Sequence, residues 1–123
     1  MKRTRIAFLA LLLACQGVWG VEIDAFFSGH QILDLCRAHI DETNTIKSNI
    51  CASYIAGVVD YQSVLLGLGW LSKKDAWCLP EHVTTRQLVH VVVEHMENIP
   101  IDILNDAGAA QVSIALLNTY PCN

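Results

Sequence analysis

Residues 84–99, TTRQLVHVVVEHMENI, decide the fold class of this 123-residue chain. The β-branched run at residues 89–93 favours a strand by propensity. Thr84 and Gln87, however, have the spacing of a helix capping box, and apolar residues recur every three or four positions to the end of the stretch. Because this period extends well beyond the β-branched run, the sequence predicts a helix.

Upstream of this stretch, a second capping box predicts another helix. Ser28 and Gln31 have the required spacing, and Phe27 can staple onto Ile32. The polar residues 41–44 end this helix. Its expected buried face comprises Ile32, Leu33, Cys36 and Ile40.

A longer helix is predicted to follow, beginning near Thr45 or Ser48 and ending at Gly67. Its expected buried stripe comprises Cys51, Tyr54, Ile55, Val58, Gln62 and Leu65. Gly57 lies inside this helix, where glycine costs about 1 kcal/mol relative to alanine. We therefore expect another helix to approach closely at Gly57.

The last predicted helix has Pro100 in its first turn and ends at Pro121. Its expected stripe comprises Ile103, Ala107, Ala110, Ile114 and Leu117. Residues 68–83 are predicted to be the longest irregular segment. The predicted fold is therefore all-α: a compact single domain of four helices, arranged as two helical hairpins with two disulfides.

The first twenty residues are predicted to be a secretory signal peptide. A basic start precedes the apolar run at residues 6–14, and small residues before position 21 permit cleavage after Gly20. Residues 21–123 would then form the mature all-α domain. Alternatively, residues 12–15 resemble a lipobox that would attach lipid at Cys15. No later stretch approaches eighteen consecutive apolar residues, so we expect a soluble periplasmic protein without a membrane partner unless Cys15 is lipidated.

Removal of the signal changes both the charge and the cysteine count. Five basic and twelve acidic residues remain, giving −7 and arguing against nucleic acid as a partner. The four remaining cysteines predict two disulfides in an oxidising compartment. Antiparallel hairpins favour the pairs Cys36–Cys51 and Cys78–Cys122. The rival interpretation is a metal site that uses the Cys36-x-x-His39 spacing.

The sequence offers little catalytic chemistry. It contains no GxSxG, P-loop, HExxH or GxGxxG motif. His90 and His95 are five residues apart, which does not place them on one helix face, and Asp60 has no evident partner carboxylate. We therefore predict a binding protein rather than an enzyme, with no catalytic residues, cofactor or metal.

Three ordered groups of residues carry a family resemblance. They are Cys51-x-x-Tyr54-Ile55-x-Gly57-Val58-x-Asp60, then Cys78-Leu79-Pro80 with Val83-Thr84-x-x-Gln87-Leu88, and finally Tyr120-Pro121-Cys122. Over residues 33–122 the chain resembles the Rap/Tai family of type VI secretion amidase immunity proteins. The resemblance implies a small, often dimeric, all-α periplasmic protein. It would bind a papain-like peptidoglycan amidase effector and occlude its catalytic cleft, protecting the cell.

Exposed loops are the candidate contact surfaces for such a partner, because aromatic residues beside charges form interface anchors. The first choice is the segment after the long helix, and the second is the loop of the first hairpin. The candidate residues are Trp70, Lys73, Asp75 and Trp77, followed by Asp41 and Glu42. The alternative function is a general periplasmic or acid-stress chaperone, in which histidines and carboxylates would respond to pH. A small hydrolase is a third, disfavoured hypothesis.

Overall fold

The computed structural model describes residues 25–122, and the predicted signal peptide with Cys15 lies outside these residues. Within them the chain is helical and contains no β-strand, only isolated bridges that join Ser28 to Ala107 and Trp77 to Pro121. The α-helices are α1 (Gly29–Asp41), α2 (Thr45–Gly67), α3 (Thr85–Glu97), α4 (Ile101–Leu104) and α5 (Gly108–Thr119). A short 3-10 helix, η1 (Lys73–Asp75), follows α2. The all-α prediction is confirmed.

Side-chain caps fix where the helices begin. The Ser28 hydroxyl accepts from the Gln31 N–H, while the Gln31 side chain accepts from the Ser28 N–H at 2.9 Å. Thr84 and Gln87 form the same reciprocal pair at the start of α3. Both predicted capping boxes are therefore confirmed. The stretch at residues 84–99 forms a helix because this cap and its buried face together outweigh the β propensity of its valines.

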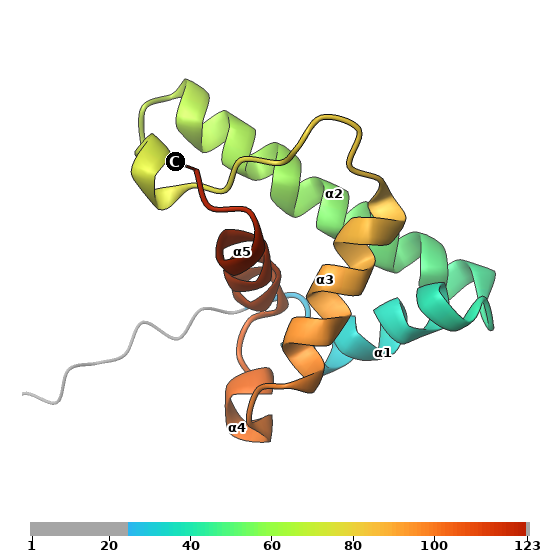
Figure 1. The fold of residues 1–123 in the computed structure, drawn as a ribbon. Helices are drawn as coiled ribbons and strands as arrows, with labels where there is room; N and C mark the ends of the chain where they lie inside the picture. Colours follow the sequence, from blue (N-terminus) through green and yellow to red (C-terminus); the bar gives the residue numbers. More distant parts are fainter. Residues whose placement is uncertain (1–24, 123) are drawn as a thin grey trace, which may run out of the picture.

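The core lies among α1, α2, α3 and α5, each of which contacts the other three (Figure 1). Its fully buried large side chains come from all four helices. They include Ile32, Cys36, Cys51, Ile55, Val89, Val92, Met96, Val112 and Leu116. The short helix α4 adds Leu104 to this cluster.

Both predicted disulfides are present. Cys36–Cys51 joins α1 to α2, and Cys78–Cys122 joins the segment after η1 to the chain beyond α5. The second bond is reinforced by the backbone, since the Cys78 N–H donates to the Tyr120 carbonyl at 2.7 Å. Each disulfide therefore fastens a site where two distant segments already meet.

The predicted fourth helix is divided. Pro100 caps α4, which ends at Leu104, and α5 begins only at Gly108. The break arises because residues 106–108 pair with the N-terminal segment: the Gly29 N–H donates to the Asp106 carbonyl at 2.8 Å, and the Gly108 N–H donates to the Phe27 carbonyl at 2.7 Å. These tertiary bonds replace the helical bonds of a continuous helix.

The division also changes which face of α5 is buried. The predicted stripe is wrong for this helix, because Ala110, Ile114 and Leu117 are exposed, as is Ile103 of α4. The buried residues of α5 are instead Gly108, Gln111, Val112, Ala115 and Leu116. The face carrying Ile114 and Leu117 is left open on the surface.

Close approach occurs at other glycines than the one predicted. A Cβ at Gly57 would meet no atom within 4 Å, so the expected helix contact there is wrong. A Cβ at Gly29 would lie 2.6 Å from the Leu104 carbonyl oxygen, and one at Gly108 would lie 2.6 Å from Cγ1 of Ile32. The tight junction therefore joins the start of α1 to the α4–α5 boundary.

Helix α2 is more apolar than its predicted buried stripe alone requires. It is the one described helix that is long and apolar enough to cross a membrane by length and composition, with a mean hydropathy of 1.3. The helix is nevertheless fastened to the domain by the Cys36–Cys51 disulfide. Only 17% of its most apolar window is buried, so much of its apolar surface is exposed.

Candidate functional site

An open groove of about 730 Å³ lies between α2 and α5. Its third wall is the segment that contains η1. The larger lining residues are Tyr54, Val58, Tyr61 and Leu65 of α2, Ile114 and Leu117 of α5, and Leu71, Asp75 and Trp77 of the third wall. Apolar and aromatic side chains therefore predominate, as in sites that bind another apolar group.

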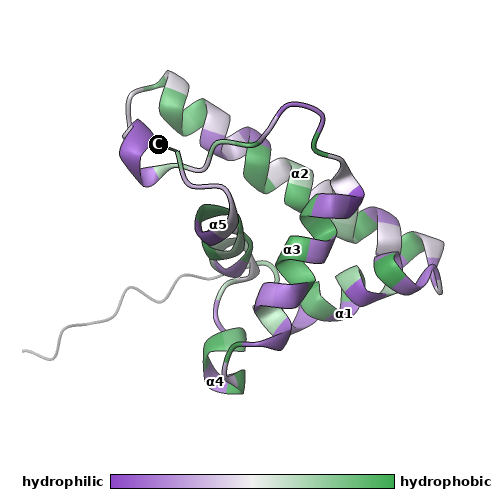
Figure 2. Cartoon of the chain, viewed as in Figure 1, coloured by the Kyte–Doolittle hydropathy of each residue, from purple (hydrophilic) through white to green (hydrophobic). Residues whose placement is uncertain are grey.

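Small residues keep the groove open. Gly57 faces it from α2, and Ala109, Ala110 and Ser113 face it from α5. Because these side chains are short, the larger ones are left accessible on the walls: Tyr61 is 61% exposed and Ile114 is 41% exposed. Figure 2 shows hydrophobic residues along much of the α2 and α5 ribbons. An exposed groove lined mainly by apolar side chains is a typical protein contact site.

One wall is held in place by a buried amide. The Gln62 side chain donates to the Trp77 carbonyl at 2.9 Å and accepts from the Trp77 N–H at 3.0 Å. Gln62 is a polar residue within the apolar stripe of α2. Its side chain takes the place of a backbone hydrogen-bonding partner for the segment that crosses this helix. This pair fixes the segment after η1 against α2.

Aromatic rings lie at the Tyr54 end of the groove, opposite the end near Gln62. The rings of Phe27 and Tyr54 meet edge to face, with centroids 5.6 Å apart. Burial raises the pKa of the Tyr54 hydroxyl, and the backbone of Ala109 acts in the opposite direction. The chain that precedes α1 therefore reaches the groove where α2 lies beside the start of α5.

Of the first set of predicted contact residues, Asp75 and Trp77 line this groove, whereas Trp70 and Lys73 do not. Trp70 is 76% exposed, and Lys73 and Asp75 are exposed within η1. Trp77 is only 8% exposed, so it forms part of the wall instead of an exposed loop anchor. Its burial follows from the two hydrogen bonds to Gln62.

The second set, Asp41 and Glu42, lies beside the start of α2. Trp70 follows the other end of this helix, whose 23 residues span about 35 Å. The structure therefore does not bring the two predicted sets together. Both acidic residues are exposed, and Asp41 borders a smaller polar groove between α1 and α3.

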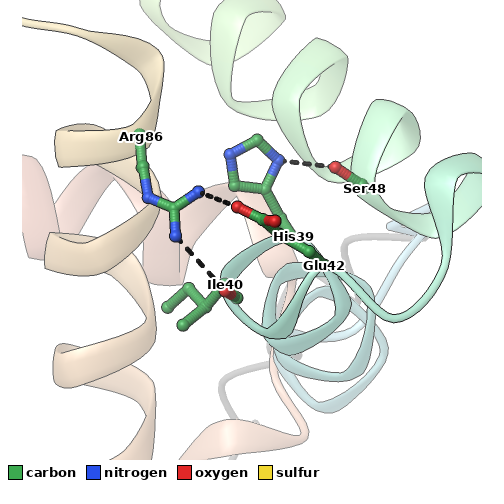
Figure 3. Close-up of polar contacts among 5 residues, drawn as sticks. All are labelled: His39, Ile40, Glu42, Ser48 and Arg86. Carbon is green, nitrogen blue, oxygen red and sulfur yellow. Dashed lines mark hydrogen bonds and ion pairs between the residues drawn. The ribbon is translucent and has the colours of Figure 1, made fainter.

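Glu42 has a structural partner (Figure 3). Its carboxylate accepts from Arg86 of α3 at 2.9 Å, and the same guanidinium donates to the Ile40 carbonyl at 3.4 Å. Nearby, His39 and Ser48 form a 2.8 Å hydrogen bond between α1 and α2. These polar contacts join the ends of three helices, and Glu42 adopts the left-handed conformation that ends α1.

Comparison with models of known protein families gives a match for this chain. The model of the family described as Rap1a immunity proteins matches residues 28–122. The chain belongs to the Rap1a immunity protein family. The match begins at the cap of α1 and ends at the second disulfide, so it includes every wall of the groove. No curated protein matches the chain. The family resemblance predicted from the sequence is confirmed, and membership indicates an immunity protein against a secreted effector.

The described part of this Rap1a-family protein offers no metal site. Residues 25–122 contain no group of three His, Cys, Asp or Glu side chains placed to hold a metal ion. The Cys36 sulfur is bonded to Cys51, so the Cys36-x-x-His39 spacing does not provide a thiolate ligand. Asp60 is exposed on α2 and forms no ion pair within the described residues.

The groove itself was missed by the sequence analysis. One signal was present: α2 carries large apolar residues outside its buried stripe, and one of them, Tyr61, lines the groove. The wall formed by α5 could not be predicted, because the predicted stripe placed Ile114 and Leu117 on the buried face. The break before Gly108 turns a different face of α5 towards the core and leaves these two residues exposed.

Proposed function

We propose that this protein is a periplasmic immunity protein that binds a peptidoglycan amidase effector delivered by type VI secretion. Family membership supports an immunity role. The observation that carries the proposal is the open apolar groove between α2 and α5, because an immunity protein that blocks an enzyme needs an accessible contact surface. Exposed Trp70 directly precedes Leu71, which lines the groove. The two disulfides suit an oxidising compartment outside the cytoplasm.

The proposed mechanism is steric occlusion. The immunity protein would place its groove and the η1 segment over the cleft of a papain-like amidase, which keeps peptidoglycan peptides from the catalytic cysteine. Trp70 would act as an aromatic anchor, with Lys73 and Asp75 as its polar rim. The charge of −7 expected after signal removal would accelerate association with a basic partner.

Protection in cells is the direct test. A candidate amidase directed to the periplasm should lyse cells, and co-production of this protein should prevent lysis. The purified pair should form a stable complex in which peptidoglycan cleavage is inhibited. Trp70→Ala should weaken both effects, whereas Ile46→Ala is a matched control because Ile46 is 73% exposed near the opposite end of α2.

Other outcomes would replace the proposal. Binding of many unfolded proteins in acid, without inhibition of any native amidase, would support the general chaperone. Equal loss of protection in the Ile46 and Trp70 variants would show that the groove is not the contact surface.

Charge reversal at Asp41 tests the second predicted surface. Light scattering tests the homodimer that we also propose from the resemblance.

A further inference from the structure

We propose that the groove between α2 and α5 receives an apolar helix of the partner protein, and that one basic side chain of this helix pairs with Asp75. This rests on the proposed function, since the helix would belong to the effector. The uncovered glycine of α2, the helical spacing of the groove walls and the charge of the groove lining each favour this occupant.

The face of α2 that borders the groove contains an uncovered glycine. Gly57 lines the groove and is exposed, and a Cβ at this position would meet no atom within 4 Å. Glycine inside a helix costs about 1 kcal/mol relative to alanine, and no packing contact within residues 25–122 offsets this cost. Ala109, Ala110 and Ser113 line the groove from α5. These short side chains leave room for the backbone of another helix to approach α2 and α5 closely.

The larger lining residues recur at helical spacing on both of these walls. On α2 they lie four, three and four positions apart, and on α5 they lie three positions apart. They are Tyr54, Val58, Tyr61 and Leu65 on α2, and Ile114 and Leu117 on α5. Rows with this spacing form the ridges between which the side chains of another helix pack.

The length and type of the groove also fit a helix. From Tyr54 to Leu65 the groove follows α2 for eleven positions, which is about 17 Å or three helical turns. Residues 25–122 contain no β-strand whose edge could pair with an extended segment. Packing of an amphipathic helix is therefore the recognition mode that this surface offers.

The groove lining includes one charged side chain among the described residues, that of Asp75. This carboxylate is exposed and forms no ion pair within residues 25–122. The neighbouring Lys73 and Lys74 do not line the groove. A carboxylate at the edge of an apolar groove favours an occupant with a basic residue at that edge, and arginine can bind it with two parallel hydrogen bonds.

The same wall contains an unpaired hydrogen-bond donor, which indicates the direction of the helix. Trp77 lines the groove, and its buried indole Nε1 has no acceptor within the described residues. The last turn of a helix has free carbonyl oxygens and favours a basic side chain. A helix whose last turn lies beside η1 would therefore bring a cation to Asp75 and an acceptor to Trp77. Because the Trp77 nitrogen is covered in the free protein, its ring would turn to meet this acceptor.

Binding of synthetic helices to the purified protein tests the proposal. The probe is a stapled helical peptide of about 14 residues, with leucines spaced i, i+3, i+4 and i+7 and one arginine in its last turn. Matched peptides have glutamine or glutamate in place of the arginine, or have the arginine in the first turn. Fluorescence anisotropy should show that the last-turn arginine peptide binds tightest, about two- to fivefold tighter than the glutamine peptide, and that the glutamate peptide binds most weakly.

Two pairs of variants locate the contact. Gly57→Leu fills the uncovered position and should weaken binding of every peptide by about tenfold or more. Ala56→Leu adds the same side chain at an exposed position that does not line the groove, so it should leave binding unchanged. Asp75→Asn should remove the preference for arginine, whereas Asp60→Asn, outside the groove lining, should preserve it. Circular dichroism checks that each variant keeps its helices.

Three results would overturn the helix site. They are absence of peptide binding, equal affinity for the arginine and glutamate peptides, and equal binding by the Gly57→Leu and Ala56→Leu variants. Light scattering that shows a dimer of the free protein and a monomer of Gly57→Leu would assign the groove to a second copy instead.

Amidase inhibition separates this site from the proposed function. An amidase that is inhibited equally by the unmodified protein and by Gly57→Leu would overturn the helix site and leave the immunity function intact. Binding of the arginine peptide by a protein that inhibits no amidase would overturn the amidase target and leave the groove as a helix site.

Discussion

The side chain of Gln62 replaces a strand partner for Trp77: its amide satisfies both the N–H and the C=O of that residue, at 3.0 and 2.9 Å. Both residues are buried, with exposed fractions of 6% and 8%. A backbone segment with no regular secondary structure is thereby sealed against a helix. The relationship explains how an irregular segment can form a stable wall of a functional groove.

Replacing Gln62 should therefore destabilise the domain strongly. Gln62→Leu leaves two buried backbone groups without partners, and we expect a loss of roughly 2–4 kcal/mol in the free energy of unfolding. Chemical denaturation followed by circular dichroism measures this loss. Asp60→Asn, an exposed change on the same helix, is the control and should be nearly neutral. A neutral Gln62→Leu would show that the two hydrogen bonds are dispensable.

The glycines should respond to alanine in opposite directions. Gly29→Ala and Gly108→Ala introduce a Cβ at 2.6 Å from existing atoms, so each should cost about 1–3 kcal/mol. Gly57→Ala meets no atom within 4 Å and should stabilise α2 by about 0.5–1 kcal/mol. Melting temperatures of the three variants compare these effects. Destabilisation by Gly57→Ala would indicate that a partner approaches α2 at this position.

The two disulfides should differ in their resistance to reduction. Cys36 and Cys51 are fully buried, whereas Cys78 is exposed, so a mild thiol should reduce Cys78–Cys122 first. Timed alkylation followed by mass spectrometry measures the order in which the two disulfides are reduced. Paired alanine substitutions should cost roughly 3 kcal/mol for the shorter loop and roughly 4 kcal/mol for the longer loop. Faster reduction of Cys36–Cys51 would contradict the buried position of that bond.

The ion pair between Asp34 and Lys47 should be visible in a pH titration. Lys47 lies 2.6 Å from the Asp34 carboxylate and lowers its pKa below the ordinary 3.8. Because the folded pKa is depressed, the stabilisation is present above the unfolded value and is lost as pH falls through the folded value. Carboxyl chemical shifts should show the low pKa, and Lys47→Met should raise it. Lys74→Met, which removes no ion pair within residues 25–122, should leave it unchanged.

Local patterns predicted most of the helices and both disulfides. The Ser28–Gln31 and Thr84–Gln87 spacings specify helix starts because each cap is formed within four residues. The cysteine pairs follow once adjacent helices are taken as antiparallel. These features depend on neighbours in the chain or on simple hairpin geometry, so a single sequence contains enough information.

The break before α5 could not be predicted in the same way. It depends on two hydrogen bonds, one donated by the Gly29 N–H to the Asp106 carbonyl and one donated by the Gly108 N–H to the Phe27 carbonyl, between residues about eighty positions apart. The groove depends on this break, because the register of α5 decides whether Ile114 is buried or exposed. The spacing of apolar residues along the chain therefore could not predict features that depend on backbone contacts between distant residues.

The positions of the cysteines also set the order in which the two disulfides can form as the chain is synthesised. A chain made from its N-terminus can close Cys36–Cys51 once the first hairpin is complete, but Cys78 must wait for Cys122. At about 5–20 residues per second, several seconds separate the two closures. During that interval Cys78 is a free thiol, next to a groove wall that has not yet folded. An oxidoreductase that delays its oxidation would thereby improve the yield of correctly paired protein.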